Sequence, residues 1–125
     1  MASTLSEKVK SFIASTDMRS HQFHIVDLTA AAFKVNLAAA LKAFGVLQNN
    51  PNAGEHASVV VEGETMVAVG AAVSVGDWIT AAATGWGAAT TSSVDQLILG
   101  RCITAAASGM LATVDVDVLR VGPIA

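Results

Sequence analysis

The chain has 125 residues, of which 53% are hydrophobic and only 14% are charged, with a formal net charge of −3 at pH 7. This composition excludes a disordered protein, because disordered chains are poor in apolar residues and rich in charge. The seven Lys and Arg residues are scattered, so they do not form the basic cluster that nucleic-acid binding requires. We therefore expect no nucleic-acid partner.

No stretch approaches the eighteen or so uninterrupted apolar residues of a spanning helix, and the N-terminal residues lack the basic-then-apolar order of a signal peptide. We expect no membrane partner and a product made in the cytoplasm. The apolar excess is mostly Ala and Val, whose small side chains build a thin core. With so few surface charges, part of the apolar surface is expected to be buried against other copies, so we expect a homo-oligomer.

Residues 1–20 are polar, and the spacing of their few large apolar side chains would suit one face of a short helix. Such a short helix is marginal alone, so we expect an N-terminal arm ordered mainly by a partner protein. This arm should contribute more to binding than to the stability of the domain. The candidate contact residues are Lys8, Lys10, Phe12, Ile13 and Arg19.

Residues 21–48 are ambiguous. Residues 30–44 are rich in Ala and Leu and would score as helix on propensity alone, whereas Phe33, Val35 and Leu37 alternate with polar residues as in a strand. The strand interpretation is preferred because everything downstream is β, although a short helical turn near residues 38–42 remains open.

From Ala43 onward, short β runs are separated by turns rich in Gly, Asn and Ser. Val114, Val116 and Val118 alternate with two Asp residues, which is typical of a half-buried strand. Several closely spaced strands with no long helix predict an all-β fold, a small antiparallel barrel or sandwich. We expect residues 21–125 to form one β domain.

A weak internal repeat has an offset of 55 residues. Residues 45–47, 53–54 and 57–59 align without gaps with residues 100–102, 108–109 and 112–114. Two similar hairpins closing one barrel would explain the repeat, and coincidence is the alternative.

Few residues suggest chemistry. On a strand, His21 and His24 would point to opposite faces, and Cys102, the only cysteine, lies in an apolar strand as a small buried hydrophobe would. The carboxylate pairs at positions 62 and 64 and at positions 115 and 117 are interpreted as solvated strand faces. The sequence predicts no catalytic residue, no metal site and no cofactor.

The two tryptophans are interpreted differently. Trp78, in the predicted strand 77–80, is expected to be core. Trp86 lies between two glycines and is expected at an exposed loop tip, as an interface anchor or, alternatively, as a platform for stacking a sugar.

Several short motifs occur in a characteristic order along residues 10–118. They are Phe44-Gly45-Val46, Ala53-Gly54-Glu55, Val75-Gly76-Asp77, Gly100 and Ser108-Gly109. In order and spacing they resemble the capsid decoration (cement, or head-stabilising) proteins of tailed phages. The chain departs from that pattern at Trp78 and Trp86, which are bulkier than expected, and in its C-terminal extension. These departures put the oligomeric contact surface in doubt.

The resemblance implies an all-β virion structural protein without enzymatic activity, usually a homotrimer. Such a protein would bind the major capsid protein on the outer surface of the assembled shell and stabilise it by bridging subunits. Another phage component, such as a tail-tube or head-completion protein, is the main alternative, and a carbohydrate-binding module or a small hydrolase are the others.

Overall fold

The computed structural model describes residues 8–90 and 96–121, and this part of the chain is almost entirely β-structure, which confirms the predicted fold class. Its helical structure is a single 3-10 turn, η1 (Ala83–Gly85), so the described residues hold no helix able to cross a bilayer. The strands are β1 (Lys8–Ala14), β2 (Ile25–Leu28), β3 (Lys34–Leu37), β4 (Gly45–Leu47), β5 (His56–Ala68), β6 (Trp78–Ala81), β7 (Gly87–Thr90), β8 (Gln96–Cys102) and β9 (Leu111–Val121).

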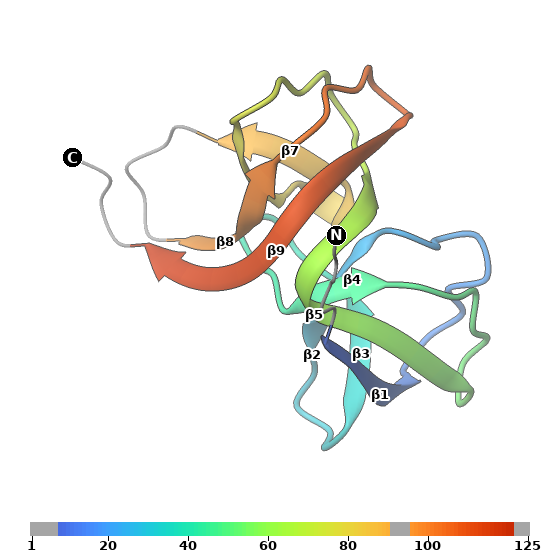
Figure 1. Ribbon diagram of the computed structural model, residues 1–125. Coiled ribbons are helices and arrows are strands. Elements are labelled where there is room, and N and C mark those ends of the chain that lie inside the picture. Colours follow the sequence, from blue (N-terminus) through green and yellow to red (C-terminus); the bar gives the residue numbers. More distant parts are fainter. Residues whose placement is uncertain (1–7, 91–95, 122–125) are drawn as a thin grey trace.

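Four strands and the first half of β5 form a closed ring, which we call ring one (Figure 1). β1 pairs in parallel with β3 and antiparallel with β5, while β2 joins β3 to β4 and β4 pairs with β5. Every strand of the ring therefore has two hydrogen-bonded neighbours, and closure of this kind leaves no free sheet edge around the ring.

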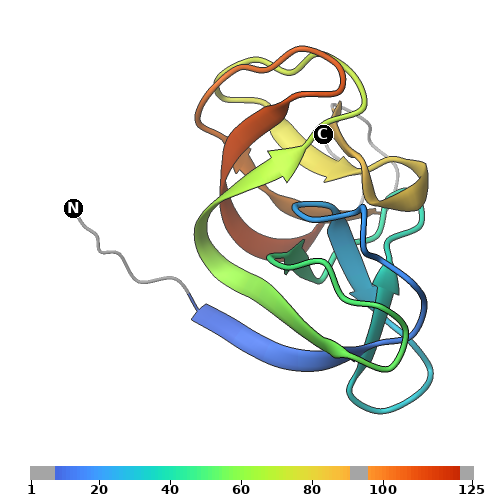
Figure 2. The same cartoon turned by 90° about the vertical axis from the view of Figure 1, so that its right-hand side faces the viewer.

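The second half of β5 begins a second ring with β9, β8, β6 and β7, which we call ring two. An isolated bridge between Val69 and Gly87 closes it, supported by the Gly70 amide, which donates to the Gly87 carbonyl at 3.0 Å. Figure 2 shows β5 as one long curved strand running through both rings. Gly63 lies in the middle of β5. Its φ of 110° is a backbone conformation that glycine adopts readily and other residues rarely do.

The two rings are one backbone unit used twice, so the repeat predicted at an offset of 55 residues is present in the fold. Strand pairs keep their register when 55 is added to both residue numbers. Four pairs of ring one show this, each followed by its equivalent in ring two: Phe12↔Ala57 by Val67↔Ala112, Ile13↔His56 by Ala68↔Leu111, Val46↔Val60 by Arg101↔Asp115, and Leu47↔Val59 by Cys102↔Val114. The expected explanation is corrected in one respect, because the two hairpins close two rings that share β5 and not one barrel.

Two apolar clusters fill the molecule. The cluster of ring one is built from Ala14, Met18, Val26, Val35, Leu47, Ala57 and Val59. The larger cluster fills ring two and includes Val67, Ile79, Leu99 and Val114, together with Ile25 and Val46 from ring one. The larger cluster therefore contains side chains from both rings, and it packs the two rings against each other.

The extended N-terminal segment differs from the expected arm. From Lys8 it is strand β1, and Ala14 and Met18 behind it are buried. Phe12 packs edge-on against Phe44, with ring centroids 5.3 Å apart. β1 completes ring one by pairing on both sides, so residues 8–14 form a strand of the ring and not the expected short helix. The part of the predicted arm before Lys8 lies outside the described residues.

The ambiguous middle segment is resolved in favour of strands. Val35 is buried and Leu37 half-buried in β3, as the alternation predicted. Residues 38–42 form a turn in which the Lys42 amide donates to the Ala39 carbonyl at 3.2 Å, but Leu41 has a φ of 67°, so this turn is not helical.

Candidate interaction surfaces

Three of the predicted contact residues are exposed on β1. Lys8 and Lys10 are exposed, and the Lys8 ammonium lies 3.4 Å from a carboxylate oxygen of Glu62. Ile13 is 37% exposed, whereas Phe12 is turned toward the core of ring one. Phe12 is therefore a packing residue in the structure, and the other three remain accessible.

The tip of the β2–β3 hairpin lies directly beside Ile13. The Ile13 amide donates to the Phe33 carbonyl at 2.8 Å, and the Phe33 side chain is 75% exposed. We call Lys8, Lys10, Ile13 and Phe33 the β1 surface. Sequence reasoning missed Phe33 because its place in the alternation suggested burial, yet its φ of 61° places it in the turn before β3.

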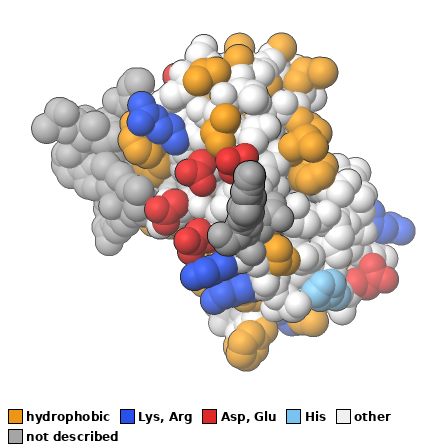
Figure 3. All heavy atoms as spheres, in the orientation of Figure 1, with side chains coloured by type: hydrophobic (Ala, Val, Ile, Leu, Met, Phe, Trp, Pro, Cys, Tyr) orange, Lys and Arg blue, Asp and Glu red, His pale blue; other side chains and the backbone are white. Residues whose placement is uncertain are grey.

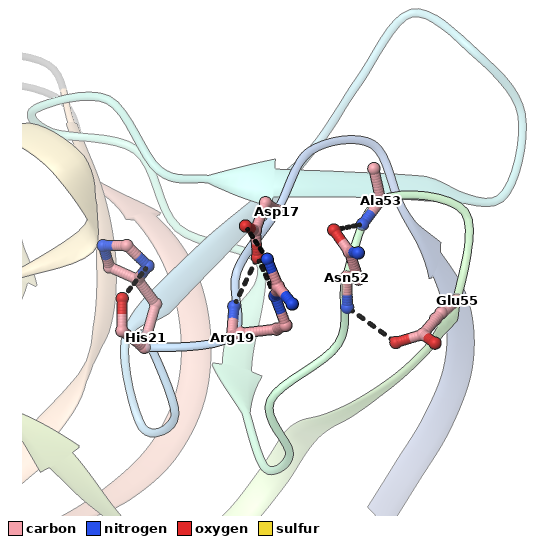
Figure 4. A network of polar contacts seen from close by, with 7 residues as sticks. Asp17, Arg19, His21, Asn52, Ala53 and Glu55 are labelled. Carbon is pink, nitrogen blue, oxygen red and sulfur yellow. Dashed lines mark hydrogen bonds and ion pairs between the residues drawn. The ribbon is translucent and has the colours of Figure 1, made fainter.

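Arg19, the fifth predicted contact residue, is held by its own loop. Its guanidinium donates to both carboxylate oxygens of Asp17 at 2.9 and 3.0 Å, as Figure 4 shows. These hydrogen bonds lower the pKa of Asp17 to about 2. The neighbouring loop is polar too, because the Asn52 amide donates to Glu55 at 2.8 Å. We call residues 15–20 and 48–56 the polar end of ring one.

Charged side chains line the face shared by β5 and β9. Glu62 lies opposite Asp117 and Glu64 opposite Asp115, and all four are exposed. Figure 3 shows a group of acidic side chains beside basic ones on this view of the molecule. Arg101 pairs in register with Asp115 on the side of β8. The carboxylates therefore lie in exposed cross-strand pairs on a sheet surface, in keeping with a solvated face.

The two tryptophans have the opposite environments to those expected. Trp78 is 43% exposed at the start of β6, with the Arg101 guanidinium 5.1 Å from its ring centre. Trp86 is half-buried because it follows η1 and lies over Gly70, where the absence of a side chain leaves room for the indole. The expectation of an exposed Trp86 at a loop tip is thus corrected.

The histidine pair also differs from expectation. His21 and His24 lie in a turn and not in a strand, so their rings meet edge to face at 4.9 Å. His24 is buried against Trp86, with its Nδ1 3.1 Å from the Thr84 carbonyl oxygen, and burial lowers its pKa. Among the described residues, no group of three His, Cys, Asp or Glu side chains is placed to hold a metal ion.

Cys102 is buried in β8. Its thiol donates to the Thr104 carbonyl at 3.0 Å, and burial raises its pKa. A raised pKa disfavours the thiolate that a nucleophile needs. The thiol therefore behaves as a packed, hydrogen-bonded core group.

The loops at the far end of ring two carry no charged residue, and Asp77, whose carboxylate accepts from the Ser74 amide at 2.8 Å, lies at their border. Residues 70–75 and 103–111 contain no Asp, Glu, Lys, Arg or His, and we call them the uncharged end. The upper part of Figure 3, where these loops lie, is correspondingly orange and white. Its exposed large apolar side chains are Val75 (68%), Met110 (59%), Leu111 (43%) and Ile103 (39%).

A small double ring with its distinctive features on outer surfaces has the organisation of a binding or structural protein. The family model for phage cement proteins matches residues 7–118. The chain therefore belongs to the phage cement protein family and is a capsid-associated structural protein of a phage.

The comparison with solved structures agrees in fold. The crystal structure of the head fiber gp8.5 N base of bacteriophage phi29 is 16% identical, with a TM-score of 0.69, and the match covers 90% of this chain and 95% of that one. At this identity the likeness concerns the fold alone. No curated protein matches the sequence.

Proposed function

We propose that this protein decorates the outer surface of a tailed-phage capsid and stabilises it, as a homotrimer that bridges subunits of the major capsid protein. Membership of the cement family over nearly the whole chain is the observation that carries this proposal. The head fiber base of phi29, a protein of similar fold, belongs by its name to the head of a phage. The protein acts by binding and not by catalysis.

The β1 surface is the part proposed to contact the shell. It combines two exposed ammonium groups, Lys8 and Lys10, with two accessible apolar side chains, Ile13 and Phe33. Apolar anchors of this kind supply most of the affinity of an interface, while neighbouring charges improve orientation. Each contact can be modest, because a trimer binds through three copies and the later contacts form at high effective concentration.

The carbohydrate-binding alternative depended on an exposed platform at Trp86. That ring is half-buried against His24, and one face of the exposed Trp78 has the Arg101 guanidinium beside it. The exposed platform at Trp86, on which this alternative depended, is therefore not formed.

The test is a decoration assay. The protein is mixed with undecorated, expanded capsids of its own phage, and occupancy is measured by cryo-electron microscopy. We expect wild-type protein to occupy ordered positions on the outside and to raise the temperature at which the shells break. Absence from the outer surface would contradict the proposal.

The β1 surface is tested by the double variant Ile13→Thr with Phe33→Asn, whose residues suit a strand and a positive φ respectively. Losing one or two apolar anchors should weaken the binding free energy by about 1–3 kcal/mol per copy. The protein concentration needed for half-occupancy of the capsid should therefore rise roughly tenfold or more. Met66→Ser, at another exposed apolar position on β5, is the control and should bind as wild type. Unchanged binding of the double variant would exclude this surface.

A further inference from the structure

The repeat provides an internal comparison between the two loop ends. The loops of ring one and ring two hold the same backbone hydrogen bonds at positions 55 residues apart. The matching amide-to-carbonyl pairs are Met18→Pro51 and Val73→Ala106, both 2.9 Å, Gly54→Ala14 and Gly109→Val69, both 2.8 Å, and Ala14→Glu55 and Val69→Met110, at 2.9 and 3.0 Å. The polar end and the uncharged end are therefore two versions of one scaffold.

The side chains of the two ends differ, because ring one has charged or strongly polar residues where ring two has small or apolar ones. At equivalent positions the polar end has Asp17, Arg19, Asn50, Asn52, Glu55 and His56, and the uncharged end has Ala72, Ser74, Ala105, Ala107, Met110 and Leu111. The shared backbone accepts polar residues at each of these places in ring one. The lack of charge in ring two is therefore not a requirement of the loops, and it leaves apolar side chains in water, which is typical of an interaction surface.

We infer that the uncharged end is the surface through which copies of this chain associate with one another. In a trimer, identical residues come close together around the three-fold axis, so a charged surface placed there would bring like charges together. The β5–β9 face, with Glu62, Glu64, Asp115 and Asp117, would gather carboxylates from three copies in that position, whereas the loops of the uncharged end carry no such residues. Because each copy has a net charge of −3, copies repel one another least where the surface between them is neutral.

Hydrogen bonds tie the loops of the uncharged end to each other. Val73 and Ala106 exchange two backbone hydrogen bonds at 2.9 and 3.2 Å, and the Ser108 hydroxyl donates to the Gly70 carbonyl at 2.8 Å. Its Ala, Ser and Gly residues have little side-chain freedom to lose. Association would therefore cost little ordering entropy, and close approach would leave Met110 and its apolar neighbours as the anchors.

The inference rests on the proposed homotrimer but not on capsid binding. Its test is sedimentation of the full chain at micromolar concentration, comparing wild type with the double variant Ala72→Asp with Met110→Glu. These substitutions install what ring one has at positions 17 and 55, so the backbone accommodates them. Ala53→Glu, which adds a charge to the polar end, is the control. Unchanged circular dichroism verifies that each variant is folded.

We expect wild type and control to sediment as a trimer, and the double variant as a 12.7 kDa monomer, with the concentration for half-dissociation raised roughly a hundredfold or more. A trimeric double variant, or a wild type that stays monomeric, would overturn the inference. Capsid binding separates the two proposals. If the double variant is monomeric and wild-type trimers ignore capsids, the inference holds and the proposed function fails. If the double variant stays trimeric but loses capsid binding, the uncharged end contacts the shell instead.

Discussion

Gly45 and Gly100 occupy equivalent positions in β4 and β8, where strands approach too closely for any side chain. A Cβ built on Gly45 would lie 2.5 Å from the Val60 carbonyl oxygen, and one built on Gly100 would overlap the carbonyl of Asp115. The obstructing residues are again 55 apart. Among the glycines of the predicted motifs, Gly45 and Gly100 thus have a steric cause, which is the close approach of β4 to β5 and of β8 to β9.

Replacing Gly100 by Ala should therefore force the β8–β9 pair apart. We expect a loss of at least about 2 kcal/mol in the free energy of unfolding, measured by urea denaturation. Gly54→Ala is the comparison, because Gly54 has open space around it and a φ of 83°, so only backbone strain of about 1 kcal/mol opposes the change. Equal losses would show that the β8–β9 backbone can relax.

The buried His24 should make stability depend on pH. Its pKa is lower in the folded protein than its ordinary value of 6.5, because burial disfavours the imidazolium, and His21 faces it while Trp86 covers it. As pH falls, the unfolded chain binds the proton first. The stability contributed by neutral His24 is therefore present above pH 6.5 and is lost as pH falls below it toward the folded pKa.

Thermal unfolding between pH 7.5 and 5 checks this expectation. The melting temperature of wild type should fall through this window, and His24→Gln should flatten the slope even if its melting temperature at pH 7.5 is lower. His56→Gln, at an exposed histidine, is the control and should keep the wild-type slope. A slope unchanged by His24→Gln would assign the pH dependence to other groups.

At the level of elements, β1 shows where prediction from sequence reaches its limit. The strand 114–118 was predicted correctly because its two faces differ, with Val inside and Asp outside. β1 has no such alternation, and its partner in β5 is more than forty residues away along the chain. Its strand character is therefore imposed by long-range pairing, whereas its local sequence suits a short helix in a polar segment.

The same reason explains the candidate surfaces. The predicted contact residues Lys8, Lys10 and Ile13 are exposed, but Phe33 joins them only because β1 and β3 run side by side. Which tryptophan is exposed depends on the residue across the strand or turn, Arg101 for Trp78 and Gly70 for Trp86. Composition predicted an apolar surface poor in charge, whereas the position of the uncharged end required the register of the two rings.

Phe12→Ala tests whether β1 belongs to the core. Removing a half-buried ring that packs edge-on against Phe44 should lower the free energy of unfolding by about 2–4 kcal/mol, measured by chemical denaturation. Lys10→Ala, on the same strand but exposed, should change it by less than about 0.5 kcal/mol. A Phe12→Ala variant as stable as wild type would restore the interpretation of residues 8–14 as a dispensable arm.

At the level of the whole molecule, the shared strand should make the two rings unfold together. β5 belongs to both rings, and one apolar cluster contains side chains from each. Both tryptophans lie in ring two, so their fluorescence reports on that ring alone, while far-ultraviolet circular dichroism reports on both. We expect the two urea transitions to coincide. Distinct midpoints would show that ring one can unfold while ring two persists.

The polar end of ring one bears on how large an assembly of copies of this chain could become. A chain with an uncharged surface at both loop ends would have two surfaces for binding other copies. Contacts that alternate between two such surfaces need not form a closed ring, so copies could join into open fibres. Asp17, Arg19 and Glu55 give the first pole charges that stay in water. If copies associate through the uncharged end alone, assembly would end at a small closed particle, and the remaining surface would stay available for the shell.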